Sequence, residues 1–432
     1  MSWTTAPLKR QVDPTRPITY GIVQAGPDTP GGVPYIRPAD MTQTRGVTDP
    51  ESLPRTTREI AETYRRSTVA EGDIVVSIGP SFGKVMIVPA GLAEANLTQG
   101  TARLAPIASS SGRYLYWALQ AATTRQFWEA SVGGATFRAL NLEPLARTPV
   151  PLPPLGEQRR IATFLDSEVA SIETLAQARY RQLALLEERS QALVFDVVRG
   201  LREPWPRIDS GLDWLGDIPS SWPTMPVGYQ FEVLLGKMLN QENIRGLHLA
   251  PYIRNANVQW DRVATDDLLY MNFPPNERQR YAVLPGDLLV CEGGEPGRAA
   301  IWDGRVREIY YQKALHRVRA RGYSSPRWLF YCLRAATSQN VFAVEGNSTT
   351  IAHLTGEQLR AHRFPFPDRE TQDRLTATLD ADALKHTRLT ELLGRQLNLL
   401  TERRQALITA AVTGQFDVST ASGRNVTEGI TV

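Results

Sequence analysis

The sequence has few cysteines and no long hydrophobic run. Of its 432 residues only Cys291 and Cys332 are cysteines, and they form no CxxC pair. Two isolated thiols cannot build a disulfide framework, and we expect both to be buried and inert in a reducing compartment. No segment approaches the roughly 18 consecutive apolar residues of a membrane helix. The first residues, MSWTTAPLKRQVDPTRP, lack the apolar core of a secretion signal, so we expect a cytoplasmic protein.

An excess of one charge sign is also missing. The chain carries 48 basic and 45 acidic residues, a net charge of +3, which permits a polyanionic partner without demonstrating one. The five histidines have no HExxH or other metal-ligand spacing, so no metal site is predicted. They are His248, His316, His353, His362 and His386.

Catalytic motifs are absent as well. The segment GPSFGKV (79–85) resembles a phosphate loop, but it has three residues between its glycines instead of four, and Val85 stands where Ser or Thr would hold magnesium. We therefore expect a hairpin or loop shaped by glycine. No GxSxG, methyltransferase motif or dinucleotide fingerprint occurs, so neither hydrolysis nor methyl transfer has evident residues, and we predict no catalytic residue.

The main positive signal is an internal repeat with an offset of 214 residues. It aligns GDIVVSIGPSFGK (72–84) with GDLLVCEGGEPGR (286–298), and YLYWAL (114–119) with WLFYCL (328–333). Upstream the offset drifts, and PYIRPADM from Pro34 matches PYIRNANV at 217. Because the matches keep their order along the chain, we interpret them as a duplication followed by divergence.

Each repeat has two parts. The first, about 150 residues long, contains short β-branched and aromatic runs broken by Gly and Pro, with a few helical stretches. The second begins at a proline cluster, where the sheet domain ends and a long helix starts. The sequence thus predicts a mixed α/β (α+β) fold of two pseudo-symmetric repeats, each a sheet-rich domain followed by a long helix.

Apolar or small residues recur along both helices on an imperfect three-and-four step. In the first helix they are Ile161, Leu165, Val169, Ile172, Ala176, Leu183, Leu186, Leu193 and Val197. Arg179 and Ser190 interrupt this step, and the equivalent positions in the second helix, with both interruptions included, are Leu375, Leu379, Ala383, His386, Thr390, Leu393, Leu397, Leu400, Arg404, Leu407 and Ala411. Both seams therefore carry polar breaks. Two matched seams favour mutual pairing of the two helices, each roughly 65 Å long at 1.5 Å per residue, which could serve as a spacer. Packing of each helix on its own domain is the alternative.

The whole pattern resembles the specificity-subunit family of type I restriction-modification systems. The resemblance lies in PVPLPPLGEQRRIATFLD from Pro149, the preceding GGATFRALNLEPL, GDIVVSIG and the WLGDIPSSWP segment from Trp214, and it spans nearly the whole chain. The second junction departs from the pattern, since FPFPDRETQ keeps only Pro365, Pro367 and Gln372.

The resemblance implies a non-catalytic subunit with two target-recognition domains, each reading half of a split DNA site. The domains would be joined by long helices that pack as an antiparallel coiled coil and act as a spacer. Because the repeats differ, we expect the site to be asymmetric. It also implies two methyltransferase partners, which bind S-adenosylmethionine, and a motor-nuclease subunit for restriction. The chain itself would bind no cofactor and no membrane. The expected divisions are recognition domains at 1–153 and 205–367, spacer helices at 154–204 and 368–416, and a flexible tail at 417–432.

Polar residues of the repeated loops are the candidates for DNA contacts. Arg, Lys, Asn and Gln can bond guanine or adenine edges, and Ser or Thr can support base or phosphate contacts. The candidates are Arg37, Lys84, Gln99, Thr136 and Arg138 in the first domain, and Arg254, Asn255, Asn257, Arg298, Gln312, Lys313, Asn347, Ser348, Thr349 and His353 in the second.

Two alternatives stay open at this point. One is a DNA-modifying or nicking enzyme with an unrecognised site, such as Asp287 with Glu292 and Glu295, although no lysine follows closely. The other is a coiled-coil adaptor without DNA affinity.

Overall fold

The structure is a computed structural model. It describes residues 3–42, 47, 49–79, 81–92, 94–132, 138–241, 243–344, 353–415 and 417–418. The chain divides into two compact units, one formed by residues 1–180 and 394–432 and the other by residues 181–393. Two long helices, α5 (Leu155–Val198) and α11 (Arg369–Thr413), each contribute to both units. Most of the predicted tail, from residue 419, lies outside the described residues.

The first unit contains a four-stranded antiparallel sheet in the order β2-β8-β5-β6 and a three-stranded sheet in the order β4-β3-β7, in which β3 and β7 are parallel. Strands β1 and β9 form a separate antiparallel pair. The strands are β1 (Thr5–Pro7), β2 (Thr19–Tyr20), β3 (Val33–Ile36), β4 (Arg55–Thr56), β5 (Ile74–Ser77), β6 (Val85–Ile87), β7 (Asn96–Leu97), β8 (Thr101–Leu104) and β9 (Pro149–Pro151). The short helices are α1 (Arg58–Thr63), α2 (Gly112–Ala118), α3 (Ala122–Val132) and α4 (Leu142–Arg147).

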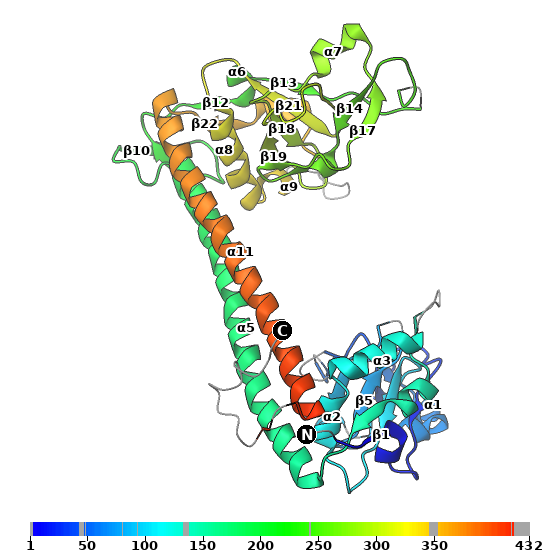
Figure 1. The fold of residues 1–432 in the computed structure, drawn as a ribbon. Coiled ribbons are helices and arrows are strands. Elements are labelled where there is room, and N and C mark those ends of the chain that lie inside the picture. Colours follow the sequence, from blue (N-terminus) through cyan, green and yellow to red (C-terminus); the bar gives the residue numbers. More distant parts are fainter. Residues whose placement is uncertain are drawn as a thin grey trace. The chain divides into compact units, whose positions relative to one another are not determined.

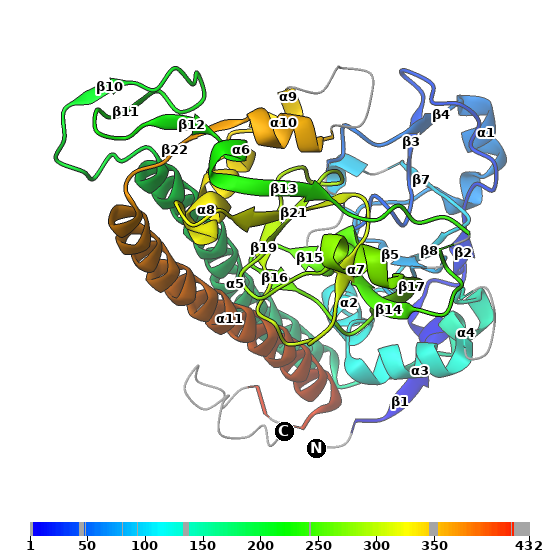
Figure 2. The ribbon, with the colours of Figure 1, turned by 90° about the horizontal axis from the view of Figure 1, so that it is seen from above.

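The second unit has a four-stranded antiparallel sheet in the order β13-β21-β18-β19 and a three-stranded sheet in the order β17-β14-β20, again with one parallel pair (Figure 2). Its strands are β10 (Arg207–Asp209), β11 (Asp217–Pro219), β12 (Thr224–Pro226), β13 (Phe231–Leu235), β14 (Leu249–Ile253), β15 (Val258–Gln259), β16 (Arg262–Val263), β17 (Leu269–Asn272), β18 (Leu288–Cys291), β19 (Ala299–Ile301), β20 (Tyr310–Tyr311), β21 (Leu315–Ala320) and β22 (Arg363–Pro365). Its helices are α6 (Val227–Gln230), α7 (Pro275–Tyr281), α8 (Pro326–Ser338), α9 (Val341–Val344) and α10 (Gly356–Ala361). The mixed α/β fold with long helices expected from the sequence is confirmed.

The central strand pairs have the same register in both units. Val75 of β5 faces Arg103 of β8, and the corresponding pair in the second unit, Leu289 and Arg317, lies 214 positions later. All eight residues of β5 and β18 are buried, as their continuous apolar sequences predict.

One helix covers each four-stranded sheet. Ser111 and Ser325 are the N-caps of α2 and α8, and their hydroxyls accept backbone N–H bonds from the first turn. Both helices bury most of their aromatic side chains in the core of their unit, including Tyr114 and Trp328. Burying one such side chain stabilises the fold by about 1.5–3 kcal/mol. Each of these two helices therefore connects its sheet to the elements that pack against the opposite face of the helix.

Within each unit, the ends of the long helices join that core (Figure 1). In the first unit, Ile161 and Leu165 of α5 share a cluster with Leu407 and Ala411 of α11. In the second, a valine group at the end of α5 shares a cluster with Leu375 and Leu379 of α11. The seam positions near the middle of the helices, from Ala176 to Leu186 in α5, are half-exposed. The two helices and the globular part thus pack together at each end.

A buried glutamine closes each junction between globular part and long helix. Gln158, in the first turn of α5, donates from Nε2 to the carbonyl oxygen of Pro153 at 3.0 Å, and its Oε1 accepts the backbone N–H of Ser111 at 2.9 Å. In the second unit, Gln372 donates to the carbonyl of Pro367 at 2.7 Å and accepts from the backbone N–H of Ser325 at 2.8 Å. One amide therefore joins the proline segment, the α2 or α8 N-terminus and the long helix.

The proline segment is fixed at a second point. The hydroxyl of Tyr114 donates to the carbonyl of Pro151 at 2.9 Å, and the indole N–H of Trp328 donates to the carbonyl of Pro365 at 2.8 Å. Different side chains at equivalent positions thus make the same bond. Because a carbonyl accepts from any suitable donor, the junction tolerates this divergence.

We predict that Gln158→Ala and Gln372→Ala each destabilise their unit by about 1–3 kcal/mol, since each leaves buried backbone groups without a partner. The measurement is calorimetric unfolding of the chain in complex with its partners. Gln177→Ala is the matched control, because Gln177 is exposed on the same helix α5. Equal destabilisation by the control and the junction variants would contradict the assigned role.

Candidate nucleic-acid interface

The glycine-rich segment of each repeat forms the turn of a β-hairpin. Gly83, between β5 and β6, has a φ of +98°, and Gly297, between β18 and β19, has a φ of +90°. Side chains with a Cβ rarely adopt these angles, which accounts for glycine at both places. The segment that resembles a phosphate loop is thus a hairpin turn.

The residue after each glycine contacts a neighbouring loop. Lys84 donates from Nζ to the carbonyl oxygens of Pro38 and Met41, both at 2.8 Å. Arg298 donates to Oδ1 of Asn255 at 3.2 Å and pairs with Glu295 at 3.3 Å. The hairpin turn therefore supports the loop that follows the PYIR sequence in each repeat, and the ammonium of Lys84 already has two partners.

The arginines of the two PYIR sequences are paired with acidic residues. Arg37 bonds Asp40 through two nitrogens, at 2.8 and 2.9 Å, and about half of its side chain is exposed. Arg254 bonds the carboxylate of Asp267 at 2.6 Å. A surface pair of this kind contributes only about 0–1 kcal/mol, so a phosphate or a base edge could compete for the guanidinium.

Two asparagine candidates also have bonds within this loop. Asn257 is buried and donates from Nδ2 to Asp267 at 2.7 Å, while its Oδ1 accepts the backbone N–H of Arg254. Asn255 donates to the carbonyl of Gly293 at 2.7 Å. These contacts hold the loop in shape and leave Asn257 little freedom to reach a base.

A second loop group lies at the turn between the two sheets of each unit. Gln99 and its equivalent Lys313 are exposed, and Gln312 is half-buried. Both turns are held by backbone hydrogen bonds. The N–H of Gln99 donates to the carbonyl of Ile22 at 2.8 Å, and the N–H of Lys313 donates to the carbonyl of Lys237 at 2.7 Å. A cavity of about 390 Å³ beside Gln99 is also lined by Tyr20 and Asn141. The equivalent turns of the two repeats thus present different side chains, Gln99 in the first and Lys313 in the second.

The structure describes some of the remaining candidates and not others. Arg138 is exposed, pairs with Glu129 and lies over the ring of Phe82 at 5.7 Å. His353 is exposed. Four candidates lie outside the described residues, namely Thr136, Asn347, Ser348 and Thr349. The exposed candidates stay predictions as DNA contacts.

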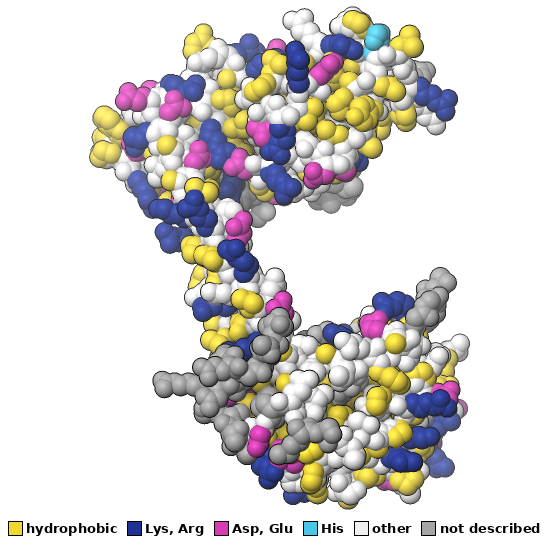
Figure 3. Space-filling model, viewed as in Figure 1, with side chains coloured by type: hydrophobic (Ala, Val, Ile, Leu, Met, Phe, Trp, Pro, Cys, Tyr) yellow, Lys and Arg dark blue, Asp and Glu magenta, His cyan; other side chains and the backbone are white. Residues whose placement is uncertain are grey.

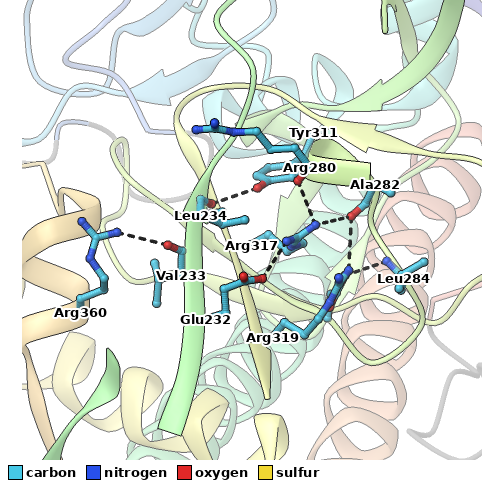
Figure 4. A network of polar contacts seen from close by, with 11 residues as sticks. Glu232, Val233, Leu234, Arg280, Ala282, Leu284, Tyr311, Arg317, Arg319 and Arg360 are labelled. Atoms are coloured by element: carbon cyan, nitrogen blue, oxygen red, sulfur yellow. Dashed lines mark hydrogen bonds and ion pairs between the residues drawn. The ribbon is translucent and has the colours of Figure 1, made fainter. Parts of the chain in front are cut away.

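Beneath the second domain's loops lies a buried arginine network (Figure 4). Arg317 donates to the carbonyls of Arg280 and Ala282 at 3.0 and 2.7 Å and pairs with Glu232 at 3.0 Å. Tyr311 donates its hydroxyl to the carbonyl of Leu234, and burial raises the pKa of this phenol, which keeps it protonated. In the first domain, the equivalent Arg103 donates to the carbonyl of Thr68 at 2.8 Å. These bonds fix the sheets that carry the loops.

Two of the three acidic residues of the enzyme alternative, Asp287 and Glu295, have other partners. Asp287 is buried and accepts two bonds from Arg319, both at 2.6 Å, as well as the backbone N–H of Leu284. Glu295 accepts the indole N–H of Trp260 at 2.8 Å. Within the described ranges, no group of three or more His, Cys, Asp or Glu side chains could hold a metal ion. The buried position of Asp287 is thus explained by its ion pair with Arg319, whose charge it neutralises.

Both cysteines are buried, as the sequence predicts. Burial raises the pKa of Cys291 to about 11 and that of Cys332 well above its ordinary value. Both thiols are therefore protonated near neutral pH, where a thiol is a poor nucleophile. Among the helices that the structure describes, none is long and apolar enough to cross a membrane.

Charged side chains are mixed on the surface. On the face drawn in Figure 3, lysine and arginine (dark blue) alternate with aspartate and glutamate (magenta) over both units. This agrees with the modest net charge of +3. On this face, charge alone therefore identifies no binding surface.

Comparison with solved structures shows which known folds this architecture resembles. The fold is similar to that of a chain from a study of complex assembly and conformational transition of the type I R-M system, with a TM-score of 0.72, 18% identity and coverage of 96% of this chain and 98% of that one. The HsdS subunit from Thermoanaerobacter tengcongensis matches with a TM-score of 0.51, 17% identity and coverage of 96% and 97%. At these identities the likeness concerns the fold.

The sequence comparisons find relatives for part of the chain. Residues 24–183 match the family model of the type I restriction modification DNA specificity domain. The type I restriction enzyme EcoBI specificity subunit of Escherichia coli is 27% identical over 199 residues, which are 46% of this chain and 41% of that protein. The match thus spans about two-fifths of that relative's length. In the matched region the chain is similar to type I DNA specificity domains.

We predict that Arg254→Ala and Arg298→Ala weaken DNA binding by the assembled complex. If the guanidinium reads guanine, the loss is about 1–3 kcal/mol at one base position; if it holds a phosphate, all sequences weaken equally and the salt dependence falls. Binding to single-base variants at two salt concentrations distinguishes these results. Arg305→Ala is the control, because Arg305 is half-exposed and pairs locally with Asp303. Unchanged affinity, specificity and salt dependence in both variants would place the reading surface on other loops.

Proposed function

We propose that this chain is the DNA sequence-specificity subunit of a type I restriction-modification methyltransferase and that it reads a split, asymmetric site. The observation that carries the proposal is that one loop framework occurs twice with different side chains. Lys84 and Arg298 occupy equivalent hairpin turns, and Gln99 and Lys313 occupy equivalent inter-sheet turns. Side chains that differ on a common backbone are what two readers of different half-sites require.

In this proposal the chain consists of two pseudo-symmetric repeats. Residues 1–153 and 205–367 are the target-recognition domains, and 154–204 and 368–416 are spacer segments whose helices pair as an antiparallel coiled coil. The shared hydrophobic clusters at both ends of α5 and α11 support this pairing. A rigid spacer would fix the distance and rotational phase between half-sites, as two-domain readers of duplex DNA need.

The partners follow from the same assignment. Double-stranded DNA is the ligand, and two methyltransferase subunits, which bind S-adenosylmethionine, supply the chemistry; motor-nuclease subunits join for restriction. The chain itself acts without catalysis and without a bound cofactor. The side chains of the enzyme alternative favour this, because Asp287 and Glu295 already have partners. The cytoplasmic location stays a prediction.

We predict that replacing residues 1–153 by the equivalent domain of another specificity subunit changes one half-site and leaves the other unchanged. The reason is that each globular part has its own core and its own glutamine junction. The measurement is selection of bound duplexes from a random pool by the complex with its methyltransferase partner. Changes in both half-sites, or in neither, would contradict the assignment of one reader to each domain.

A further inference from the structure

One carboxylate of each long helix is bonded twice by the globular part of the same unit. In the first unit, Asp166 of α5 accepts from Nε of Arg113 at 2.8 Å and from the indole N–H of Trp117 at 2.8 Å. Arg113 and Trp117 lie four positions apart on α2, so they are on one face of that helix. Two donors from successive turns of α2 thus converge on one acceptor of α5.

The second unit has the same arrangement. Asp380 of α11 accepts from Nε of Arg327 at 2.7 Å and from the hydroxyl of Tyr331 at 2.5 Å. All three residues lie 214 positions after their counterparts. The aromatic donor differs, indole in one unit and phenol in the other, while the carboxylate and the arginine are the same.

The ion pair of this cluster is too exposed to contribute much to the free energy of folding. In the first unit, 49% of the Arg113 side chain and 35% of the Asp166 side chain are exposed. Ion pairs with that exposure contribute little to folding free energy, about 0–1 kcal/mol. The geometry, by contrast, is restrictive. Together with the Gln158 amide two turns earlier on α5, the two bonds oppose rotation of α2 against the long helix.

We propose that Asp166 and Asp380 are positioning residues that fix the angle of each recognition domain on its long helix, and thereby the spacing and phase at which the two half-sites are accepted. This inference rests on the proposed function. The carboxylates contact no base in this account; they act through the orientation of the loops.

The two units should respond unequally. In the first, the turn between α2 and α3 is also bonded to α11, because Gln405 donates to the carbonyl of Gln120 at 2.9 Å and Thr409 accepts the backbone N–H of Ala122 at 3.0 Å. The position on α5 that corresponds to Thr409 is Phe195, which has no side-chain acceptor. Loss of Asp380 should therefore loosen the second domain more than loss of Asp166 loosens the first.

The second unit also offers the cleaner variant. Arg327 pairs with Asp261, within the globular part, as well as with Asp380. When Asp380 becomes Ala, both bonds to its Oδ1 are lost, while Arg327 keeps the carboxylate of Asp261 and no unpaired charge is left. Tyr331→Phe removes a single donor from the same cluster. Asp373→Ala is the matched control, because Asp373 is on α11 but pairs with Arg369 of the same helix.

The test uses the chain assembled with its methyltransferase subunits and duplexes that carry the preferred half-sites with gaps one base pair shorter or longer. For Asp380→Ala we expect the preference for the correct gap over its neighbours to fall roughly tenfold, about 1.4 kcal/mol. Asp166→Ala and Tyr331→Phe should give smaller losses, and base preferences within each half-site should not change. Asp373→Ala should match the unchanged protein.

A DNA-free measurement tests the angle itself. Spin labels at Gln339→Cys and Arg388→Cys, both exposed positions of the second unit, report the distance between globular part and helix; the two native cysteines are buried. We expect Asp380→Ala to broaden the distance distribution measured by electron double resonance. Equal weakening at every gap, or an unchanged gap preference, would overturn the proposal. An unmodified complex without any gap preference would instead refute the proposed function, and the label distances would then still show whether Asp380 fixes the angle.

Discussion

Each long helix starts at a buried amide that holds three chain segments at once. The side chains of Gln158 and Gln372 bond a proline carbonyl on one side and the first turn of α2 or α8 on the other. Since that helix also carries the aromatic core of its sheet, the orientation of the sheet follows from the junction. The loops that project from the sheet are therefore placed by a contact distant from them in sequence.

The framework and the loops of the repeats have diverged in different ways. Framework bonds mostly end on backbone carbonyls, as with Arg103 and Thr68, or Arg317 and Ala282. Such acceptors exist whatever the side chain, so the framework persists while sequences drift. Exposed loop side chains have no such constraint, and Gln99 and Lys313 differ at equivalent positions of a common backbone. A protein that must change its target without changing its shape benefits from this separation.

Sequence patterns predicted the junctions and the buried helix positions better than they predicted the contacts of individual charged side chains. The residues that persist at the second proline junction, Pro365, Pro367 and Gln372, are those whose backbone or amide makes the junction bonds. Burial of Ile161 and Leu165 followed from helical periodicity. The offset also aligns Asp166 with Asp380, yet a charged residue on a helix face resembles a solvated one until its partner from another element is placed. The pairing of Arg254 with Asp267 was hidden for the same reason, because nothing local brings them together.

The proposed function requires that this chain directs methylation to a split site. The measurement is single-molecule sequencing of methylated bases in the genome of cells with and without the gene. If the proposed function is correct, one motif loses methylation on deletion, and this motif has two different half-sites separated by a fixed gap of unspecified bases. Unchanged methylation, or the loss of a continuous or palindromic motif, would contradict it.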